Sequence, residues 1–167
     1  VFVDFWNFQL QWNSLREDDS RCDWPRMPAV LVECAGARQS RAGVPEPLQL
    51  EEARVYASYD PDPRSATDSR LRDWLANFLD RQPGFRVFAK ERVRRSRAVK
   101  CRNCGVVFTD CPSCHQPLRG SQEKGVDTAI VTDLLSLAWE DAFDVAVLVT
   151  SDADMVPCVE RIQEKGF

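Results

Sequence analysis

A short apolar run near the end of the chain stops abruptly at two carboxylates. Residues 145–149 read Val-Ala-Val-Leu-Val, and Asp152 and Asp154 follow with one residue between them. A nearly uninterrupted β-branched run suits a strand that is buried on both faces of a parallel sheet. In open α/β sheets, ligands gather beyond the carboxyl ends of such strands. The run therefore predicts a parallel sheet with two acids at its ligand-binding edge.

A helix cap is the simpler interpretation of the two acids. Ser151 or Asp152 would cap the helix that follows, with Pro157 accommodated in its first turn. One carboxylate is enough for a cap, so Asp154 would have no role in it. From these residues alone, a capping role and a functional role stay equally open.

Two further acids stand at similar places in the sequence. Asp4 follows the apolar residues 1–3, and Asn7 comes three residues later. Two strands that end in acids form a shared site if they are neighbours in the sheet. Asp127 precedes the amphipathic stretch 128–139, where it can also be an ordinary N-cap, because acids favour helix N-termini.

In this order the residues resemble the NYN domain, a family of PIN-like nucleases that includes the LabA/DUF88 group. The resemblance rests on Asp-x-x-Asn at 4–7, Lys-x-Val-Asp at 124–127, Asp133 followed by leucines, and the apolar strand that runs into two acids. The best-matching blocks are residues 1–8 and 124–167. This chain has Thr150-Ser151 and Met155 where the family usually has Ser-Gly and an aromatic residue.

The resemblance implies a three-layer α/β fold of PIN-like type, with a parallel sheet and helices on both faces. We expect a single domain over residues 1–167, truncated at its C-terminal end because the family would add at least one more strand. Strands are expected at 53–59 and 86–89, and helices at 28–38 and 65–80. In the first helix, Val30, Leu31 and Cys34 are expected to face the core.

The resemblance also implies a metal-dependent ribonuclease. Four carboxylates brought together would repel one another and any phosphate unless a divalent cation neutralised them. Hard oxygen ligands favour Mg²⁺ or Mn²⁺. The implied catalytic residues are Asp4, Asn7, Asp127, Asp152 and Asp154, and the four aspartates are the implied metal ligands. Asn7 would orient water or a phosphate oxygen, while Lys124 and Thr150 would lie on the substrate side.

Two Cys-x-x-Cys knuckles, six residues apart, form the second informative feature. This spacing is typical of a tetrahedral structural zinc site, with disulfides or an iron–sulfur cluster as the other options. Four thiolates leave no open coordination position, so the metal would be structural. The expected zinc ligands are Cys101, Cys104, Cys111 and Cys114. His115 is expected to support the site from outside or to be exposed.

The knuckles lie in an inserted basic module, residues 92–122. Residues 86–124 hold ten Lys or Arg and three acids, a local charge of +7 on a chain of net charge −4. Such asymmetry indicates a basic segment on an acidic body, suited to an RNA backbone; the alternative is a solvated charged loop. The residues expected to contact RNA are Arg94, Arg95, Arg97, Lys100 and Arg102.

Endonucleolytic RNA cleavage is the function we expect, since no feature marks a pocket for a strand end. A non-catalytic module that binds RNA or protein remains an alternative, and a phosphohydrolase of small nucleotides is a third. No stretch is apolar enough to span a membrane. The cysteine pattern, without a signal-peptide pattern, favours the cytoplasm. Whether the chain forms a homo-oligomer or has a protein partner stays open.

Overall fold

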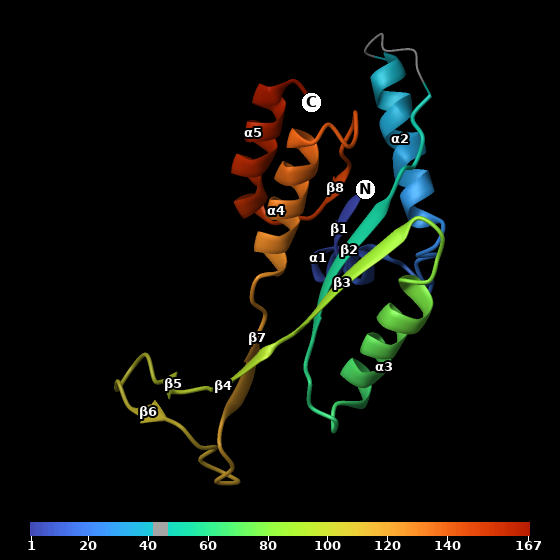
Figure 1. The fold of residues 1–167 in the computed structure, drawn as a ribbon. Coiled ribbons are helices and arrows are strands. Elements are labelled where there is room, and N and C mark those ends of the chain that lie inside the picture. The colour runs from blue at the N-terminus through green and yellow to red at the C-terminus, as the bar shows by residue number, and fades with distance from the viewer. Residues whose placement is uncertain (42–46) are drawn as a thin grey trace.

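A four-stranded parallel sheet forms the centre of the protein. The computed structural model describes residues 1–41 and 47–167. The sheet runs in the order β3 (Phe85–Glu91), β2 (Ala53–Tyr59), β1 (Phe2–Asp4) and β8 (Leu148–Val149) (Figure 1). All neighbours are parallel, and Val3 lies opposite both Val55 and Val149. The α/β fold with a parallel sheet is therefore confirmed.

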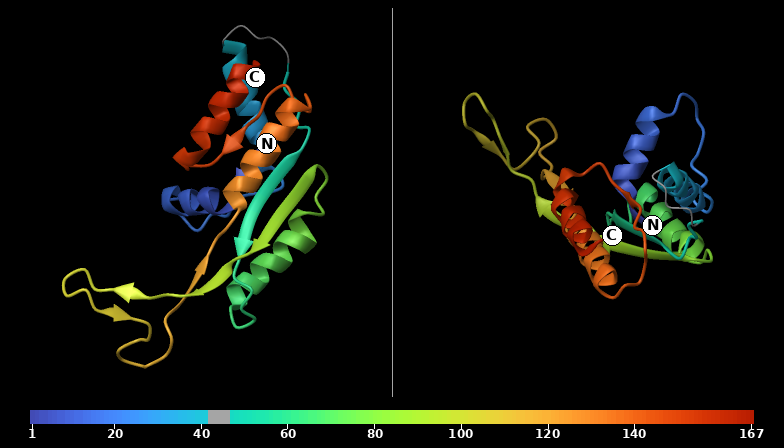
Figure 2. Two further views of the ribbon diagram at one scale, coloured as in Figure 1. Left: turned by 60° about the vertical axis from the view of Figure 1, so that its left-hand side comes forward. Right: turned by 90° about the horizontal axis from the view of Figure 1, so that it is seen from above.

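Helices cover both faces of this sheet (Figures 1 and 2). One face carries α1 (Phe5–Leu15), α2 (Met27–Arg41) and α3 (Ala66–Trp74), which continues into a π-helical turn, η1 (Leu75–Leu79). The other face carries α4 (Val126–Trp139) and α5 (Val156–Lys165), which follows the 3₁₀ turn η2 (Ala153–Met155). The expected arrangement of helices on both faces is confirmed.

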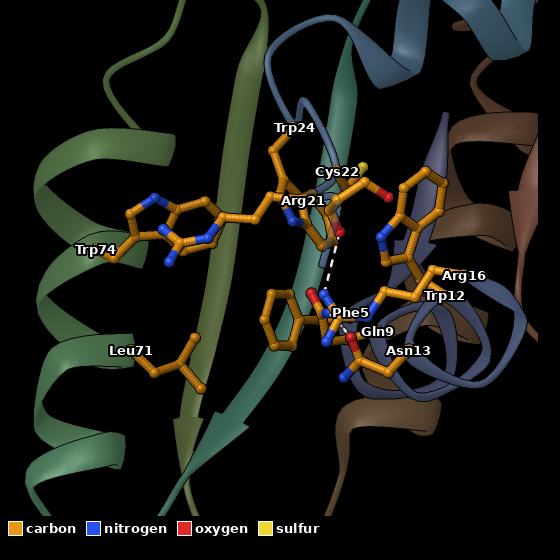
Figure 3. A pocket seen from close by; sticks show the side chains of 11 residues that line it. Phe5, Gln9, Trp12, Asn13, Arg16, Arg21, Cys22, Trp24, Leu71 and Trp74 are labelled. Carbon is orange, nitrogen blue, oxygen red and sulfur yellow. Dashed lines mark hydrogen bonds between the residues drawn. The ribbon is translucent and has the colours of Figure 1, made fainter. Parts of the chain in front are cut away.

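Alternation along the strands divides the apolar side chains between two cores. Phe2 and Tyr56 pack against α4 and α5, while Val3 and Val55 face the opposite side. Successive strand residues point to opposite faces, so each strand serves both cores. The second core includes an aromatic cluster between α1, α3 and the segment before α2 (Figure 3).

One local expectation is met only in part and another is wrong. The run 145–149 packs against both cores, with Leu148 on the side of α4 and α5 and Val149 on the other, but it is only half-buried because β8 lies at one edge of the described sheet. In α2, Val30 is 41 % exposed and Cys34 is exposed, whereas Met27 and Val32 are buried. An apolar residue in a sequence pattern does not reveal which face of the helix finds a partner.

Residues 92–122, called the arm below, form a hairpin-like projection from the sheet. In the arm, β4 (Val93–Ser96) pairs antiparallel with β7 (Arg119–Gln122), and β5 (Val99–Lys100) pairs with β6 (Val107–Phe108) near the tip. The arm leaves from the carboxyl end of β3 and returns just before α4 (Figure 1). Among the helices that the structure describes, none has the length and apolar character needed to cross a membrane.

Candidate active site

Asp4 stands at the carboxyl end of β1 and is only 2 % exposed. It is the N-cap of α1, because its Oδ1 accepts a hydrogen bond from the backbone N–H of Asn7 at 3.2 Å. Its Oδ2 accepts from Asn7 Nδ2 at 2.5 Å and from Thr150 Oγ1 at 3.4 Å. The last contact joins residues 146 positions apart in the chain. β1 and β8 thus bring the two ends of the sequence to one place.

The loop after β8 is ordered by its own polar groups. Ser151 Oγ donates to Asn7 Oδ1 at 2.5 Å, and the Asp152 N–H donates to Thr150 Oγ1 at 3.1 Å. Asp152 Oδ1 accepts from the Asp154 N–H at 2.9 Å and caps η2. The capping interpretation therefore holds for Asp152. Asp154 remains exposed and is not needed for the cap.

Asp127 lies in the first turn of α4, and Gly125 is the N-cap residue. Asp127 is therefore not the cap that the sequence allowed. Gly125 has φ +74°, a left-handed conformation that glycine adopts without strain. This turn directs the start of α4 toward the carboxyl edge of the sheet, where Asp4 lies.

The acids at this edge act on one another. Desolvation raises the pKa of Asp127, and the charges of four nearby carboxylates raise it further. They belong to Asp4, Glu123, Asp152 and Asp154. Asp4, Asp152 and Asp154 therefore lie near enough to Asp127 for their charges to act on it. Glu123 was missed, because next to Lys124 it reads as one more charge at the end of the basic segment.

The donor set suits a hard divalent cation. As the side chains stand, no three His, Cys, Asp or Glu residues in the described ranges converge closely enough to hold a metal ion. The chemistry nevertheless fits: four aspartate oxygens are the ligands that Mg²⁺ and Mn²⁺ prefer. The charge repulsion that raises the pKa of Asp127 is what a cation would relieve.

Ser58 joins the root of the arm to the same edge. It is buried near the end of β2, and its Oγ donates to Glu123 and accepts from Arg92 Nε at 2.9 Å. Its carbonyl oxygen accepts from Trp6 Nε1 at 2.7 Å, and the Arg92 guanidinium lies 4.8 Å from the centre of a Trp6 ring. Arg92, the first residue of the arm, and Glu123, which directly follows its last residue, are thus tied to one serine that also contacts Trp6 of α1.

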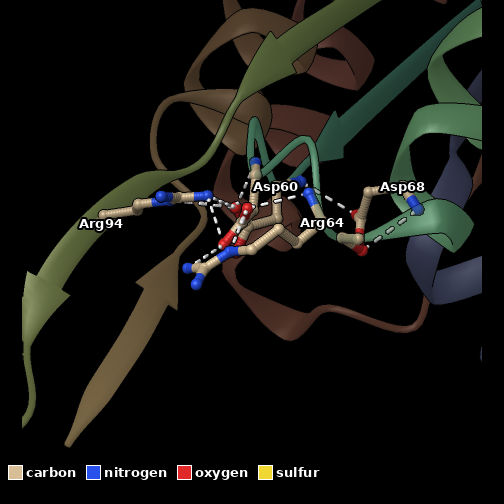
Figure 4. Close-up of polar contacts among 6 residues, drawn as sticks. Asp60, Arg64, Asp68 and Arg94 are labelled. Atoms are coloured by element: carbon tan, nitrogen blue, oxygen red, sulfur yellow. Dashed lines mark hydrogen bonds and ion pairs between the residues drawn. The ribbon is translucent and has the colours of Figure 1, made fainter. Parts of the chain in front are cut away.

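A second set of contacts holds the first strand of the arm (Figure 4). Arg94 Nη2 lies 3.1 Å from Asp60 Oδ1 and 3.0 Å from Asp62 Oδ2. Arg64 also pairs with Asp62, at 2.9 Å, and its hydrogen bonds hold the pKa of Asp62 well below the usual range. Arg94, expected on the RNA, is therefore engaged with the loop after β2.

The cysteines form two similar turns near the tip of the arm. The Gly105 N–H donates to the Cys101 carbonyl at 3.0 Å, and the His115 N–H donates to the Cys111 carbonyl at 2.8 Å. Gly105 and His115 both have positive φ, of +76° and +55°. Backbone N–H groups of each knuckle lower the pKa of Cys101 and Cys111. The structure does not assemble Cys101, Cys104, Cys111 and Cys114 into one group.

The other expected contact residues are solvent-exposed. They are Arg95, Arg97, Lys100 and Arg102 on the arm, and Lys124 where the arm returns to α4.

Asp133, which contributes to the family resemblance, has a different environment. Its Oδ2 accepts from Tyr56 Oη at 2.8 Å and from Arg54 Nη1 at 3.1 Å. It therefore fastens α4 to β2.

Comparison with known protein families gives a match over the length of the sequence. The family model of the NYN domain matches residues 1–167. Neither the curated proteins nor the solved structures contain a significant match to the chain. Because the family match spans residues 1–167, the chain belongs to the NYN domain family, whose members are PIN-like nucleases that generally act on RNA.

Proposed function

We propose that this protein is a metal-dependent endoribonuclease that hydrolyses RNA phosphodiester bonds at the carboxyl edge of the sheet. The observation that carries the proposal is the meeting of Asp4, at the end of β1, with Thr150 and the loop of Asp152 after β8. Desolvation and the charges of Asp4, Glu123, Asp152 and Asp154, which raise the pKa of Asp127, support it. A cluster of acids would repel a phosphate, so it serves phosphate chemistry only with a cation. In this proposal residues 1–167 form one catalytic domain, into which the arm is inserted.

The aspartates would hold Mg²⁺ or Mn²⁺, which when bound would acidify water and neutralise charge at the scissile phosphate. Asn7 is fixed between Asp4 and Ser151, so its amide can orient the attacking water or a phosphate oxygen. Asp127, in the first turn of α4, would contribute its carboxylate to the same cation. Lys124 would contact the RNA backbone as a point charge, and Thr150 holds the loop of Asp152 in place.

The arm would supply electrostatic affinity for the RNA strand. Arg95, Arg97, Lys100 and Arg102 are exposed on an arm that leaves from the carboxyl end of β3. Arg94 would act mainly by holding the arm, since its guanidinium already pairs with Asp60 and Asp62. Contacts of this kind release counterions, so affinity should fall steeply with salt.

The arm would also bind one structural zinc ion through its four knuckle cysteines. The repeated turn, with a left-handed residue after each Cys-x-x-Cys, supports this, as do the hydrogen bonds that favour the thiolates of Cys101 and Cys111. Zinc content of purified protein tests the proposal. Cys104→Ser should lower it and reduce stability, whereas Cys34→Ser, at an exposed thiol outside the knuckles, should change neither.

The decisive experiment is cleavage of a closed circular single-stranded RNA with Mg²⁺, Mn²⁺ or EDTA. A circle has no strand end, so cutting it shows endonucleolytic action. Cleavage should require the metal and should be lost in Asp4→Asn and Asp154→Asn. Asp144→Asn, at an exposed acid before β8, is the matched control. Cleavage that survives both active-site substitutions would contradict the proposed site.

A non-catalytic RNA-binding module is the second candidate. It is favoured by one observation: Asp4 and Asp152 both serve as helix caps and so already have structural roles. Salt-sensitive RNA binding without cleavage under any metal condition would support it. Hydrolysis of free nucleotides in place of RNA would instead indicate a small-molecule phosphohydrolase.

A further inference from the structure

A cavity of about 380 Å³ opens between α1, α3 and residues 20–24 (Figure 3). Its volume is in the range of pockets that hold small organic groups. It lies on the face of α1 that bears Phe5, Gln9, Trp12 and Arg16. The proposed catalytic chemistry uses none of these side chains.

Four aromatic side chains line the cavity: Phe5, Trp12, Trp24 and Trp74. Phe5 stacks on Trp24 with ring centres 5.1 Å apart, and Trp74 meets Trp24 edge-on at 5.8 Å. Trp12 also lines the cavity, and its ring stacks on Phe8, which meets Trp24 edge-on at 5.1 Å. A cavity of this size that is lined by several aromatic rings suits a planar aromatic ligand.

Trp12 also offers a hydrogen bond that the described residues do not take up. Its Nε1 is buried and has no hydrogen-bond partner there. Buried donors are nearly always paired, because an unpaired one keeps its desolvation cost. A ligand that carries an acceptor at its edge, as every nucleobase does, would satisfy this N–H.

The positive charge of the lining is complementary to the phosphate of a nucleotide. Arg16 and Arg21 line the cavity, and none of the Asp or Glu residues in the described part of the chain does, although the chain has 26 acids in all. The side chain of Arg16 reaches into the cavity, where Nη1 donates to the Ser20 carbonyl at 3.1 Å (Figure 3). Two guanidinium groups beside aromatic walls suit a base that is attached to phosphate.

The cavity is connected to the proposed active site through one helix. α1 begins directly after Asp4 and carries Asn7. At a rise of about 1.5 Å per residue, Trp12 lies roughly 12 Å from Asp4 along the helix axis. In the left view of Figure 2, α1 and the arm extend to the same side of the molecule. A strand held by the arm and cut at Asp4 can therefore continue along α1.

We propose that this cavity binds one unpaired base of the RNA strand, a few nucleotides from the scissile bond. The base stacks on the aromatic walls and accepts a hydrogen bond from Trp12 Nε1, while Arg16 and Arg21 contact its phosphate. This inference rests on the proposed function for its ligand, because it takes RNA as the substrate.

The test measures binding and cleavage separately. Binding of a single-stranded RNA oligonucleotide is followed in EDTA, with a series of oligonucleotides that each lack one base, and with adenosine monophosphate alone. Trp12→Ala should weaken oligonucleotide binding by about 5- to 100-fold, the usual effect of losing one base stack. Trp12→Phe keeps the ring without the N–H and should give a smaller loss. Trp139→Phe, at a 47 % exposed tryptophan on α4, should bind as the wild type does.

One abasic position should reproduce the Trp12→Ala loss in the wild type and add nothing in the variant. Equal binding by both Trp12 variants and the wild type, with unchanged thermal unfolding, would overturn the inference. So would Trp12-dependent binding of adenosine monophosphate without any effect of abasic positions, because the cavity would then be a free-nucleotide site. Asp4-dependent cleavage without Trp12-dependent binding would leave the ribonuclease standing and remove only the base site. Trp12-dependent binding of RNA without cleavage would support the base site and contradict the ribonuclease.

Discussion

Replacing Ser58 with alanine should loosen the arm from the body of the protein. Ser58 is 1 % exposed, and its hydroxyl bonds to Arg92, the first residue of the arm, and to Glu123, which directly follows its last residue. Both bonds involve a charged group, and such bonds contribute about 1.5–3 kcal/mol each. Glu123 and Arg92 are half-buried, so water would replace part of each bond. We therefore expect a total loss of about 2–3 kcal/mol in the free energy of unfolding.

Thermal unfolding followed by circular dichroism gives the direct measurement. At about 2–4 °C per kcal/mol for a domain of this size, Tm should fall by about 4–12 °C. Ser136→Ala, at an exposed serine on α4, is the matched control and should leave Tm unchanged. RNA affinity of Ser58→Ala in EDTA should also fall, because the arm would no longer be held to β2.

A double-mutant cycle separates this network from a general packing defect. The losses in Ser58→Ala and Glu123→Ala should be less than additive, because each change removes the same hydrogen bond. Additive losses, or a Tm for Ser58→Ala that equals the wild-type value, would refute the assignment of Ser58 as the link between the arm and the sheet.

The remaining predictions concern charge, backbone conformation and the arm. Because the pKa of Asp127 is raised in the folded protein, the stability of the metal-free protein should fall as pH rises from about 4 through that pKa. Urea midpoints measured in EDTA should fall less steeply with pH in Asp127→Asn than in the wild type. An equal dependence on pH in both proteins would contradict the charge interactions assigned to Asp127. Gly125→Ala should cost about 1–2 kcal/mol, measured by urea unfolding, because φ is +74°; a neutral effect would mean that this turn relaxes. Arg94→Ala should cost at most about 1 kcal/mol of stability, since its ion pairs are partly exposed. Arg97→Ala should leave stability unchanged but reduce the salt slope of RNA binding by about 0.7, the value for one single-strand phosphate contact; equal salt slopes would remove Arg97 from the interface.

Local sequence patterns predicted the four strands of the sheet and most of its helices, but not α1 or the strands of the arm. The run Ala53–Tyr59 is β2 as expected, and the helix expected at 65–80 is found as α3 followed by η1. The aspartates could be recognised because each follows an apolar run or opens a helix, which are features of neighbouring residues. Val30 and Cys34 were misplaced because helical periodicity shows that a helix has an apolar side but not which residues find a partner.

Only the tertiary structure decided which of these groups meet. The order β3-β2-β1-β8 places Thr150 against Asp4 across 146 residues, and no periodicity encodes such a contact. The same holds for the link of Ser58 to Glu123, and for the cavity at Trp12, whose walls come from separate helices. By itself, the sequence determined the elements and the supply of carboxylates, because those depend on near neighbours. The packing of the sheet and helices determined the site, because a site is a set of distances between residues far apart in the chain.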